Sequence, residues 1–395
     1  MSIPAEKLNY KINELPPRVN LLGWGLLAIG ILMILFSYYV DRTRSSFNIL
    51  ITFMFLMSIG LGSLFLVALE YVAGAVWSTP VRRISEFLST ILFSLPILAI
   101  PLYFSMHELF HWSHTADVQQ DPVLLSKAPY LNINFFVIRT LVCFAIWLGF
   151  YVLIIRNSKR QDELKDQGLT TKNIRISAVF MPVFAITISL AAIDWMMSLE
   201  PHWVSTIFGV YYFSGTILAA LASATIVIVL LKQKGYFPHI LKDHLYSLGA
   251  LLFAFTNFWA YIAFSQYLLI WYANVPEETF WFLLRWQGSW KIVSIVLIVV
   301  HFLVPYFGLL SQPAKMNPRR LLIMSVWILF AHLLDLYWLV MPTFSKKGVV
   351  LGWMEFAFPI AAVGLIIILF SLKLKNNNII PIGDPKLQRG LDFRL

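Results

Sequence analysis

The chain has 395 residues, of which 59% are hydrophobic and 13% are charged, and its mean hydropathy is +0.75. Soluble proteins carry about 25% charged residues, so this composition predicts an integral membrane protein. The net charge of +10 comes from basic residues in short links between apolar runs, a pattern that argues against nucleic-acid binding. The single Cys excludes a disulfide framework, a thiolate-bound iron–sulfur cluster, a zinc cage and a covalently attached haem.

Ten apolar runs have about the 20 residues that a helix needs to cross a bilayer. Runs of this length are too long for barrel strands, and backbone groups in lipid must be satisfied within each segment. The sequence therefore predicts an all-α membrane protein in which residues 1–395 form one integral membrane domain. The predicted helices cover residues 21–39, 47–71, 85–106, 132–155, 176–199, 205–231, 246–273, 290–310, 320–341 and 354–373.

Lys and Arg predict the orientation. Most of the 30 basic residues lie near the N-terminus, in the links after the second, fourth, sixth and eighth helices, and in the C-terminal tail. Because cytoplasmic links carry the excess of basic residues, we expect segments 1–20 and 374–395 to be cytoplasmic. The first apolar run lacks a cleavage pattern, so we expect it to stay as a helix.

Two helices end in a similar way. Asp194 stands seven residues before Pro201 in the fifth helix, and Asp335 stands seven residues before Pro342 in the ninth. Helices four apart in the chain indicate a parallel repeat. The repeat predicts two four-helix bundles, formed by helices 2–5 (residues 47–199) and helices 6–9 (205–341), with helices 1 and 10 on the flanks.

Ionisable residues inside apolar helices cost about 2.5–3.5 kcal/mol each, so each one indicates a structural or functional need. The fourth, fifth and ninth helices carry such residues in their outer third, and the eighth and ninth carry them near the middle. Two more lie toward the cytoplasmic ends of the second and third helices, where they could admit protons. These residues are Arg139, Asp194, Asp335, His301, His332, Glu70 and Glu86.

The Arg139 guanidinium stays charged, and its helix precedes that of Asp194, so we expect these two side chains to pair. The pair can be a purely structural ion pair. Alternatively, the Asp194 carboxylate could pass protons between a quinol and water.

His332 and Asp335 are three residues apart and share one helical face. An imidazole hydrogen-bonded to a carboxylate is a proton acceptor suited to physiological pH, although such a pair can also be a buried polar network. His301 is expected at a similar depth on the preceding antiparallel helix, so a single bis-His haem is conceivable. No resident metal is predicted.

His107, His111 and His114 follow the third helix at positions i, i+4 and i+7, with Glu108 beside them. This spacing would place three imidazoles along one helical side, where they could bind a metal, contact a partner or serve as a proton exit. We interpret this outer polar cluster as a polar interface.

The seventh helix carries Asn257, Tyr261 and Ser265 at i, i+4 and i+8. This polar stripe could line a file of water or contact a quinol. Hydrogen bonding between helices is the alternative.

Three stretches resemble the F subunit of bacterial alternative complex III, a quinol:cytochrome c or quinol:acceptor oxidoreductase. They are Ile193-Asp-Trp-Met-Met-Ser-Leu-Glu-Pro-His-Trp203, residues 261–279, and Leu334-Asp-Leu-Tyr-Trp-Leu-Val-Met-Pro342. The likeness extends over nearly the whole chain, and the first stretch is rich in the rare residues Trp, Met and His. Subunits of this kind are similar to the NrfD-like membrane anchors of polysulfide reductase.

The resemblance implies a subunit of the bacterial cytoplasmic membrane with two four-helix bundles and no covalently bound redox centre. It implies partners: a sister membrane subunit that binds menaquinol, an iron–sulfur protein and multihaem cytochromes c, with a terminal oxidase as a further candidate. Bound phospholipids, and menaquinone or menaquinol, are the expected non-covalent ligands. Onto this chain the resemblance carries Asp194, Asp335 and the histidines of residues 107–114 as parts of a proton path.

The sequence therefore predicts a respiratory membrane subunit that assists assembly and proton conduction and that could bind quinol. A secondary transporter or proton-coupled channel is the first alternative, because the repeat and the buried polar residues also occur there. A purely structural membrane scaffold is the second alternative.

Overall fold

The computed structural model describes residues 11, 15–375 and 377–395. Of the predicted N-terminal segment 1–20, residues 1–10 and 12–14 lie outside this part. The described chain is helical and contains no strand beyond one antiparallel bridge between Lys11 and Asn378. Ten of its helical segments are long and apolar enough to cross a membrane, which confirms the predicted all-α character and the ten candidate spans.

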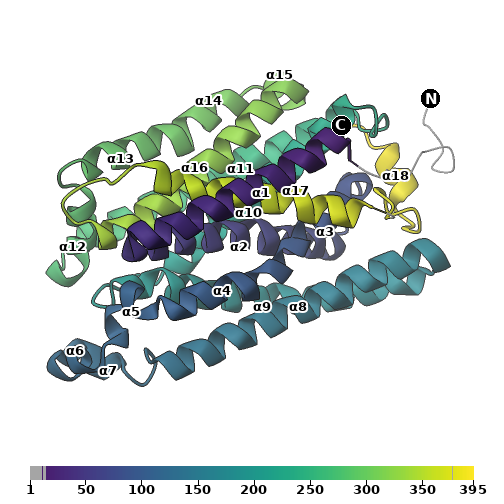
Figure 1. The fold of residues 1–395 in the computed structure, drawn as a ribbon. Coiled ribbons are helices and arrows are strands. Elements are labelled where there is room, and N and C mark those ends of the chain that lie inside the picture. Colours follow the sequence, from purple (N-terminus) through teal and green to yellow (C-terminus); the bar gives the residue numbers. More distant parts are fainter. Residues whose placement is uncertain (1–10, 12–14, 376) are drawn as a thin grey trace.

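The membrane spans run roughly side by side (Figure 1). Most of them are single helices, whereas the third, the fifth and the eighth are composite. In chain order the spans are α1 (Pro17–Val40), α2 (Arg42–Ala73), η2 (Thr79–Val81) to α4 (Leu95–Phe104), α8 (Ile133–Leu164), α9 (Gln167–Trp195) with η5 (Met197–Leu199), α10 (Phe208–Gln233), α11 (Lys242–Ala273), α13 (Trp290–Leu297) to α14 (Val304–Leu309), α16 (Pro318–Phe344) and α17 (Trp353–Leu374).

Short helices connect the spans. At one end of the molecule lie α5 (Met106–Leu109), η4 (His111–Ser113), α6 (Thr115–Gln120), α7 (Pro122–Lys127) and α12 (Pro276–Arg285) (Figure 1). At the opposite end lie α15 (Gln312–Met316) and α18 (Leu387–Leu391), together with the start of α1. An even number of candidate spans brings the start of α1 and the described C-terminal tail to the same side.

Side-chain caps fix where several long helices begin. The carboxylate of Asp41 accepts a hydrogen bond from the Arg44 backbone N–H, and Asn132 and Asn317 cap α8 and α16 in the same way. Such caps satisfy N–H groups that have no partner within the helix. The starts of these helices are therefore marked in the sequence by the capping Asp and Asn residues.

Two spans depart from a regular α-helix. The third runs through the 3₁₀ segment η3 (Ser89–Ser94) between α3 (Arg82–Leu88) and α4, and the eighth contains the π-helix η6 (Ile298–Leu303). Pro305, which follows η6, has no N–H to donate to the carbonyl of His301, so the regular ladder is interrupted here. Within η6, the Val300 carbonyl accepts a hydrogen bond of 2.8 Å from a side chain, Trp327 Nε1.

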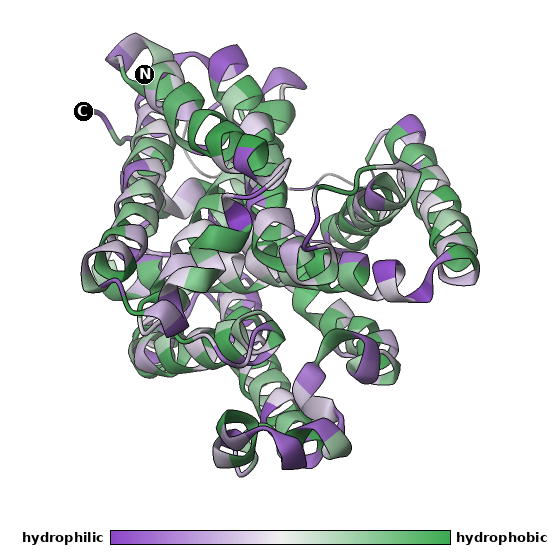
Figure 2. Ribbon diagram, turned by 90° about the vertical axis from the view of Figure 1, so that its left-hand side faces the viewer, coloured by the Kyte–Doolittle hydropathy of each residue, from purple (hydrophilic) through white to green (hydrophobic). Residues whose placement is uncertain are grey.

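The two central spans are α2 and α10, which pack against each other. α2 also contacts α9 and α16, and α10 also contacts α9, α11 and α16. α1 packs mainly on α17, where Gly30 lies directly against Ala361. Seen along the spans, hydrophobic colouring predominates on the helices and hydrophilic colouring gathers in the connecting segments (Figure 2).

Candidate functional site

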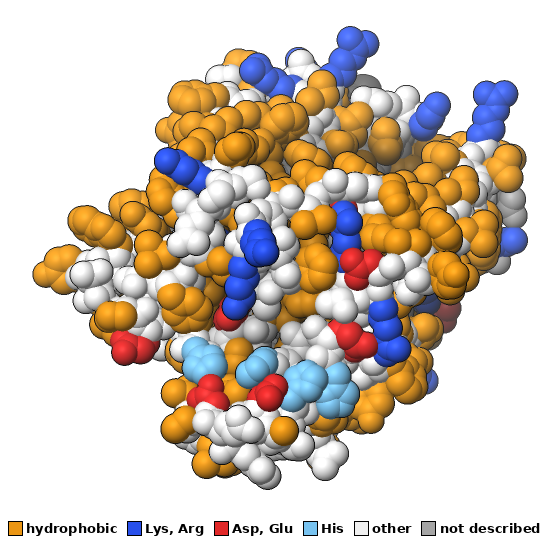
Figure 3. Space-filling view, turned by 60° about the vertical axis from the view of Figure 1, so that its left-hand side comes forward, with side chains coloured by type: hydrophobic (Ala, Val, Ile, Leu, Met, Phe, Trp, Pro, Cys, Tyr) orange, Lys and Arg blue, Asp and Glu red, His pale blue; other side chains and the backbone are white. Residues whose placement is uncertain are grey.

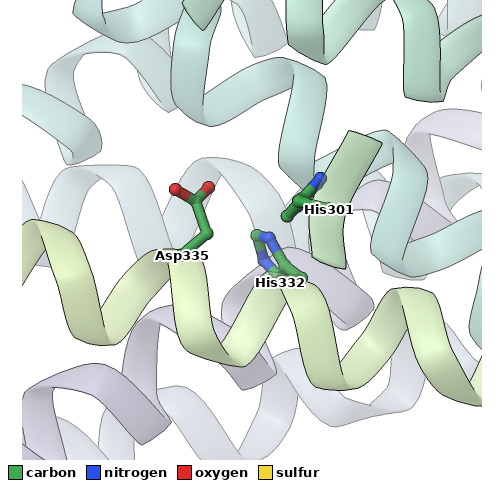
Figure 4. Close-up of side chains that lie close together, drawn as sticks. All are labelled: His301, His332 and Asp335. Atoms are coloured by element: carbon green, nitrogen blue, oxygen red, sulfur yellow. The ribbon is translucent and has the colours of Figure 1, made fainter. Parts of the chain in front are cut away.

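His301, His332 and Asp335 meet in the interior of the helix bundle (Figure 4). α16 supplies His332 and Asp335, and the π-helix η6 supplies His301. Each of the three side chains is at most 2% exposed, and one nitrogen or oxygen atom of each lies within 4.8 Å of the other two. The prediction that His332 and Asp335 share a face, close to His301, is confirmed.

Asp335 is held by two hydrogen-bond donors. Tyr211 Oη on α10 donates to Oδ1 at 2.5 Å, and Trp259 Nε1 on α11 donates to Oδ2 at 3.1 Å. Among the described residues, no cation lies within salt-bridge distance of this carboxylate. A buried carboxylate without a cation is costly as an anion, and holding a proton removes that cost.

The two imidazoles keep free nitrogen atoms. Neither nitrogen of His301 has a hydrogen-bond partner in the described part of the chain, although its ring stacks on Trp259 at 3.7 Å between centroids. His332 Nδ1 is likewise without a partner, while Nε2 lies 3.0 Å from Ser58 Oγ. Unpaired buried polar atoms cost about 1–3 kcal/mol each, so this arrangement asks for a chemical reason.

The imidazole–carboxylate hydrogen bond expected for His332 and Asp335 is not formed in the described structure. Tyr211 and Trp259 occupy the carboxylate oxygens, and His332 turns toward Ser58 on α2. One polar atom of each group nevertheless lies within 4.8 Å of the other.

A row of hydroxyl groups continues from His332. Ser58 Oγ lies 3.0 Å from Tyr212 Oη, and Thr216 Oγ1 lies 3.5 Å from Ser58 Oγ. Gly215 makes room for the imidazole, because a Cβ atom there would lie 2.8 Å from His332 Cε1. Together these groups form a polar thread between α2, α10 and α16.

Asp194 has the opposite environment. Arg139 binds it through two hydrogen bonds, Nε to Oδ2 at 2.8 Å and Nη2 to Oδ1 at 3.0 Å, which confirms the predicted pair. Tyr130 Oη adds a third donor at 3.0 Å, and its ring lies 3.8 Å from the Arg139 guanidinium. This bidentate, buried ion pair favours a structural role for Asp194.

A cleft of about 890 Å³ adjoins the Asp335 site. Tyr211 and Trp259, the two donors to Asp335, belong to its lining. Of the predicted polar stripe, Asn257 and Tyr261 line the cleft, and Asn257 Nδ2 also donates to the Phe253 carbonyl of its own helix. The cleft is lined mainly by aromatic and aliphatic side chains of α11, α12 and α13.

Glu70 and Glu86 belong to a buried ion network at the end of the molecule where α18 lies. Arg82 binds Glu70 at 3.0 Å, Glu86 at 3.2 Å and Asp384 at 2.7 Å. Arg83 contacts Glu86 and binds Asp162 at 2.6 Å. Both predicted carboxylates are therefore paired with arginines.

The outer polar cluster differs from its prediction, because His107, His111 and His114 do not lie along one continuous helix. The chain is extended at Phe110 (φ −115°, ψ 112°), whose buried ring packs against Trp112, so α5 ends before η4 begins. His114 Nε2 instead folds back to the His107 carbonyl at 2.9 Å.

His202, which the sequence did not single out, joins this outer cluster. Its Nε2 lies 2.6 Å from Asp121, and a second cleft of about 460 Å³ is lined by the cluster's histidines, by Glu108 and by His202. Figure 3 shows histidine and acidic side chains gathered on this face. Although burial raises the pKa of Asp121, hydrogen bonds from His202 and two backbone N–H groups hold it below its ordinary value.

His301, His332 and Asp335 have the donor atoms that a transition-metal ion would take. Both Asp335 oxygens already accept hydrogen bonds, from Tyr211 and Trp259, so an ion bound there would have to displace one of these donors.

Sequence reasoning missed Tyr211, Trp259 and Ser58, which hold the cluster. Tyr and Trp are common in membrane helices, and no local pattern indicates that these two face Asp335. A scan against models of known protein families finds no match for this chain, and a search of curated proteins finds no significant match. Any proposal for the function must therefore be argued from the chemistry of the site.

Proposed function

We propose that the chain is a membrane subunit of a respiratory quinol:electron-acceptor oxidoreductase of the alternative complex III type, and that Asp335 and His332 conduct protons within it. The observation that carries this proposal is the buried Asp335 carboxylate without a cation, beside two imidazoles with free nitrogens. Acids and bases that exchange protons need such sites, whereas structural carboxylates are paired as Asp194 is.

The route follows the polar groups. Asp335 gives its proton to His332, and takes another from the cleft through Tyr211, whose hydroxyl gains a proton as it gives one up. Ser58 and Tyr212 extend the thread along α2 and α10. The network of Glu70 and Glu86 is the candidate cytoplasmic end of this route.

Electrons take another path in this proposal. Quinol oxidation releases two electrons and two protons, and the electrons go to haems and iron–sulfur clusters on partner subunits. The sister membrane subunit binds menaquinol, and Asn257 and Tyr261 are candidates for a second quinol contact. The outer polar cluster is the face for the outer redox subunits.

The arrangement in the membrane is part of the proposal. Helices 2–5 and 6–9 form two bundles flanked by helices 1 and 10; the contacts of α2 with α9 and of α10 with α11 and α16 support this grouping. The basic links support cytoplasmic termini in a bacterial inner membrane.

The transporter alternative has less support. It needs breaks at matching positions of both halves, yet the third span is broken at η3 while its counterpart α11 is continuous. The Arg139–Asp194 ion pair supports the scaffold alternative. A scaffold does not explain why the buried Asp335 carboxylate has no cation partner among the described residues.

The test starts from the assembled complex, isolated through a tag on this chain. We expect haem- and cluster-bearing subunits to accompany it, as identified by mass spectrometry and visible spectra. In vesicles, Asp335→Asn should lower the number of protons that appear on the outer side per electron transferred, because an amide cannot carry a proton through the site and the protons of quinol oxidation must then leave by another route. Asp194→Asn is the matched control, and complexes that contain it should keep the wild-type ratio.

Two results would contradict the proposal. One is a chain that purifies alone and transports a solute in vesicles. The other is an Asp335→Asn complex with an unchanged ratio of protons to electrons.

A further inference from the structure

Arg285 is a buried cation at the C-terminal end of α12. Its side chain is 1% exposed and stacks on Trp281, with the guanidinium carbon 3.4 Å from the ring centroid. The guanidinium donates to three backbone carbonyls, at 3.1 Å, 3.0 Å and 2.7 Å, and these belong to Trp338, Trp281 and Leu339.

No carboxylate of the described residues lies within salt-bridge distance of this cation. Arg285 is absent from the salt bridges of the described residues. Burial lowers the pKa of Arg285 to about 9, although Glu200 and Tyr211 act to raise it. The three carbonyls use three of the five N–H groups of a guanidinium, so two remain for a ligand.

Arg285 also lines the 890 Å³ cleft beside Asp335. The mouth of this cleft carries large exposed side chains: Tyr261 is 65% exposed, Trp271 61% and Trp286 52%. These residues belong to the lipid-facing side of a membrane span or to the segments next to it, where Trp and Tyr favour the headgroup level. The cleft thus joins an apolar, aromatic groove to one buried positive charge.

We propose that this cleft binds an anionic phospholipid, with the phosphate at Arg285 and an acyl chain along the groove between α11 and α13. Charge indicates the class of ligand: three carbonyls and the Trp281 ring compensate the cation only through dipoles, and an anion at the two remaining N–H groups would add the opposite charge. A neutral quinol or a zwitterionic lipid brings no net charge to the site. This inference does not depend on the proposed proton route.

The bound lipid has a structural consequence. Its headgroup would tie α12 to the end of α16, and its chain would fill the space beside Tyr211 and Trp259. These are the donors to Asp335, so the lipid would hold them in place.

The experiment is native mass spectrometry of the purified, delipidated protein after incubation with vesicles of equal parts phosphatidylglycerol and phosphatidylcholine plus menaquinone. We expect one retained phosphatidylglycerol, and Arg285→Gln should reduce its retention at least about tenfold. Arg42→Gln is the matched control, because Arg42 is an exposed arginine paired with Glu108; it should retain the lipid.

A second variant covers the case in which Arg285→Gln does not fold. Leu283→Glu changes an exposed side chain of the cleft lining, 56% exposed, and leaves every Arg285 contact in place. The new carboxylate should repel the lipid phosphate and abolish retention. Retention of phosphatidylcholine or menaquinone instead, or unchanged phosphatidylglycerol in Leu283→Glu, would overturn the proposal, whatever the result for proton release.

Discussion

Asp194 and Asp335 stand at matching positions of their helices, and their partners set them apart. Arg139 fixes the first through two charged hydrogen bonds, whereas the second has only the neutral donors Tyr211 and Trp259. The same residue type is therefore ion-paired in one span and, among the described residues, held by neutral donors in the other, where we propose that it exchanges protons.

The two aspartates should therefore differ in how much their substitution by Asn lowers the stability of the protein. Asp194→Asn leaves the Arg139 charge buried and unpaired, so we expect a loss of about 3–5 kcal/mol in the free energy of unfolding. Asp335→Asn removes no ion pair and should lower the unfolding temperature in detergent less. Equal unfolding temperatures for the two variants would contradict the distinction.

His239 gives a pH-dependent prediction outside the spans. It is 6% exposed, and neither ring nitrogen has a partner in the described chain. Burial, followed by the nearby His244 and Lys232, lowers the pKa of His239 to about 4.

Because the unfolded chain binds this proton at higher pH than the folded one, the His239 contribution is complete above about pH 6.5 and is lost as the pH falls toward 4. The loss amounts to about 3 kcal/mol. His239→Phe should remove it, so its unfolding temperature should fall less than that of the wild type between pH 7.5 and 4.5. Parallel curves for the two proteins would argue against a neutral buried imidazole.

At the scale of elements, the close approach of α2 to α10 depends on Gly62. A Cβ atom at this position would lie 2.7 Å from the Thr216 carbonyl oxygen. Gly62→Ala should therefore cost about 1–3 kcal/mol by forcing the two helices apart. Gly149→Ala, where nothing lies within 4 Å, should gain up to about 1 kcal/mol from helix propensity. Thermal unfolding of both variants checks this contrast.

The helices were predictable because a bilayer fixes their length and apolar composition, and each of the ten predicted runs overlaps one candidate span. The sequence also predicted Arg139 with Asp194, and His332 near His301 and Asp335. It did not predict Tyr211 and Trp259, because which face α10 and α11 turn toward Asp335 is decided by packing. The break at Phe110 was not predicted, because no local sequence pattern shows that its ring packs into an aromatic core.

At the scale of the whole molecule, the C-terminal tail (residues 377–395) closes the ion network. Asp384 binds Arg82, and Gly383 N–H donates to Asp162 at 3.2 Å. The imidazole of His244 donates to the Gly390 carbonyl at 2.9 Å. The tail is thus joined to α3, α8 and α11 at once.

Arg82 should be the most sensitive residue of this network. Arg82→Gln leaves Glu70, Glu86 and Asp384 with one buried cation fewer, so we expect a loss of about 3–5 kcal/mol and a low yield of folded protein. Arg42→Gln breaks an exposed pair and should cost at most about 1 kcal/mol. The yield of monodisperse protein in detergent and its unfolding temperature distinguish the two.

The same ion network bears on biosynthesis. Arg82 and its partner Asp384 are 302 residues apart, so the guanidinium leaves the ribosome long before its last carboxylate does. During translation this ion network stays incomplete until Asp384 has been made. A nascent chain that stops before Asp384 therefore leaves Arg82 without one of its partners, and quality-control proteases can act on this incomplete network.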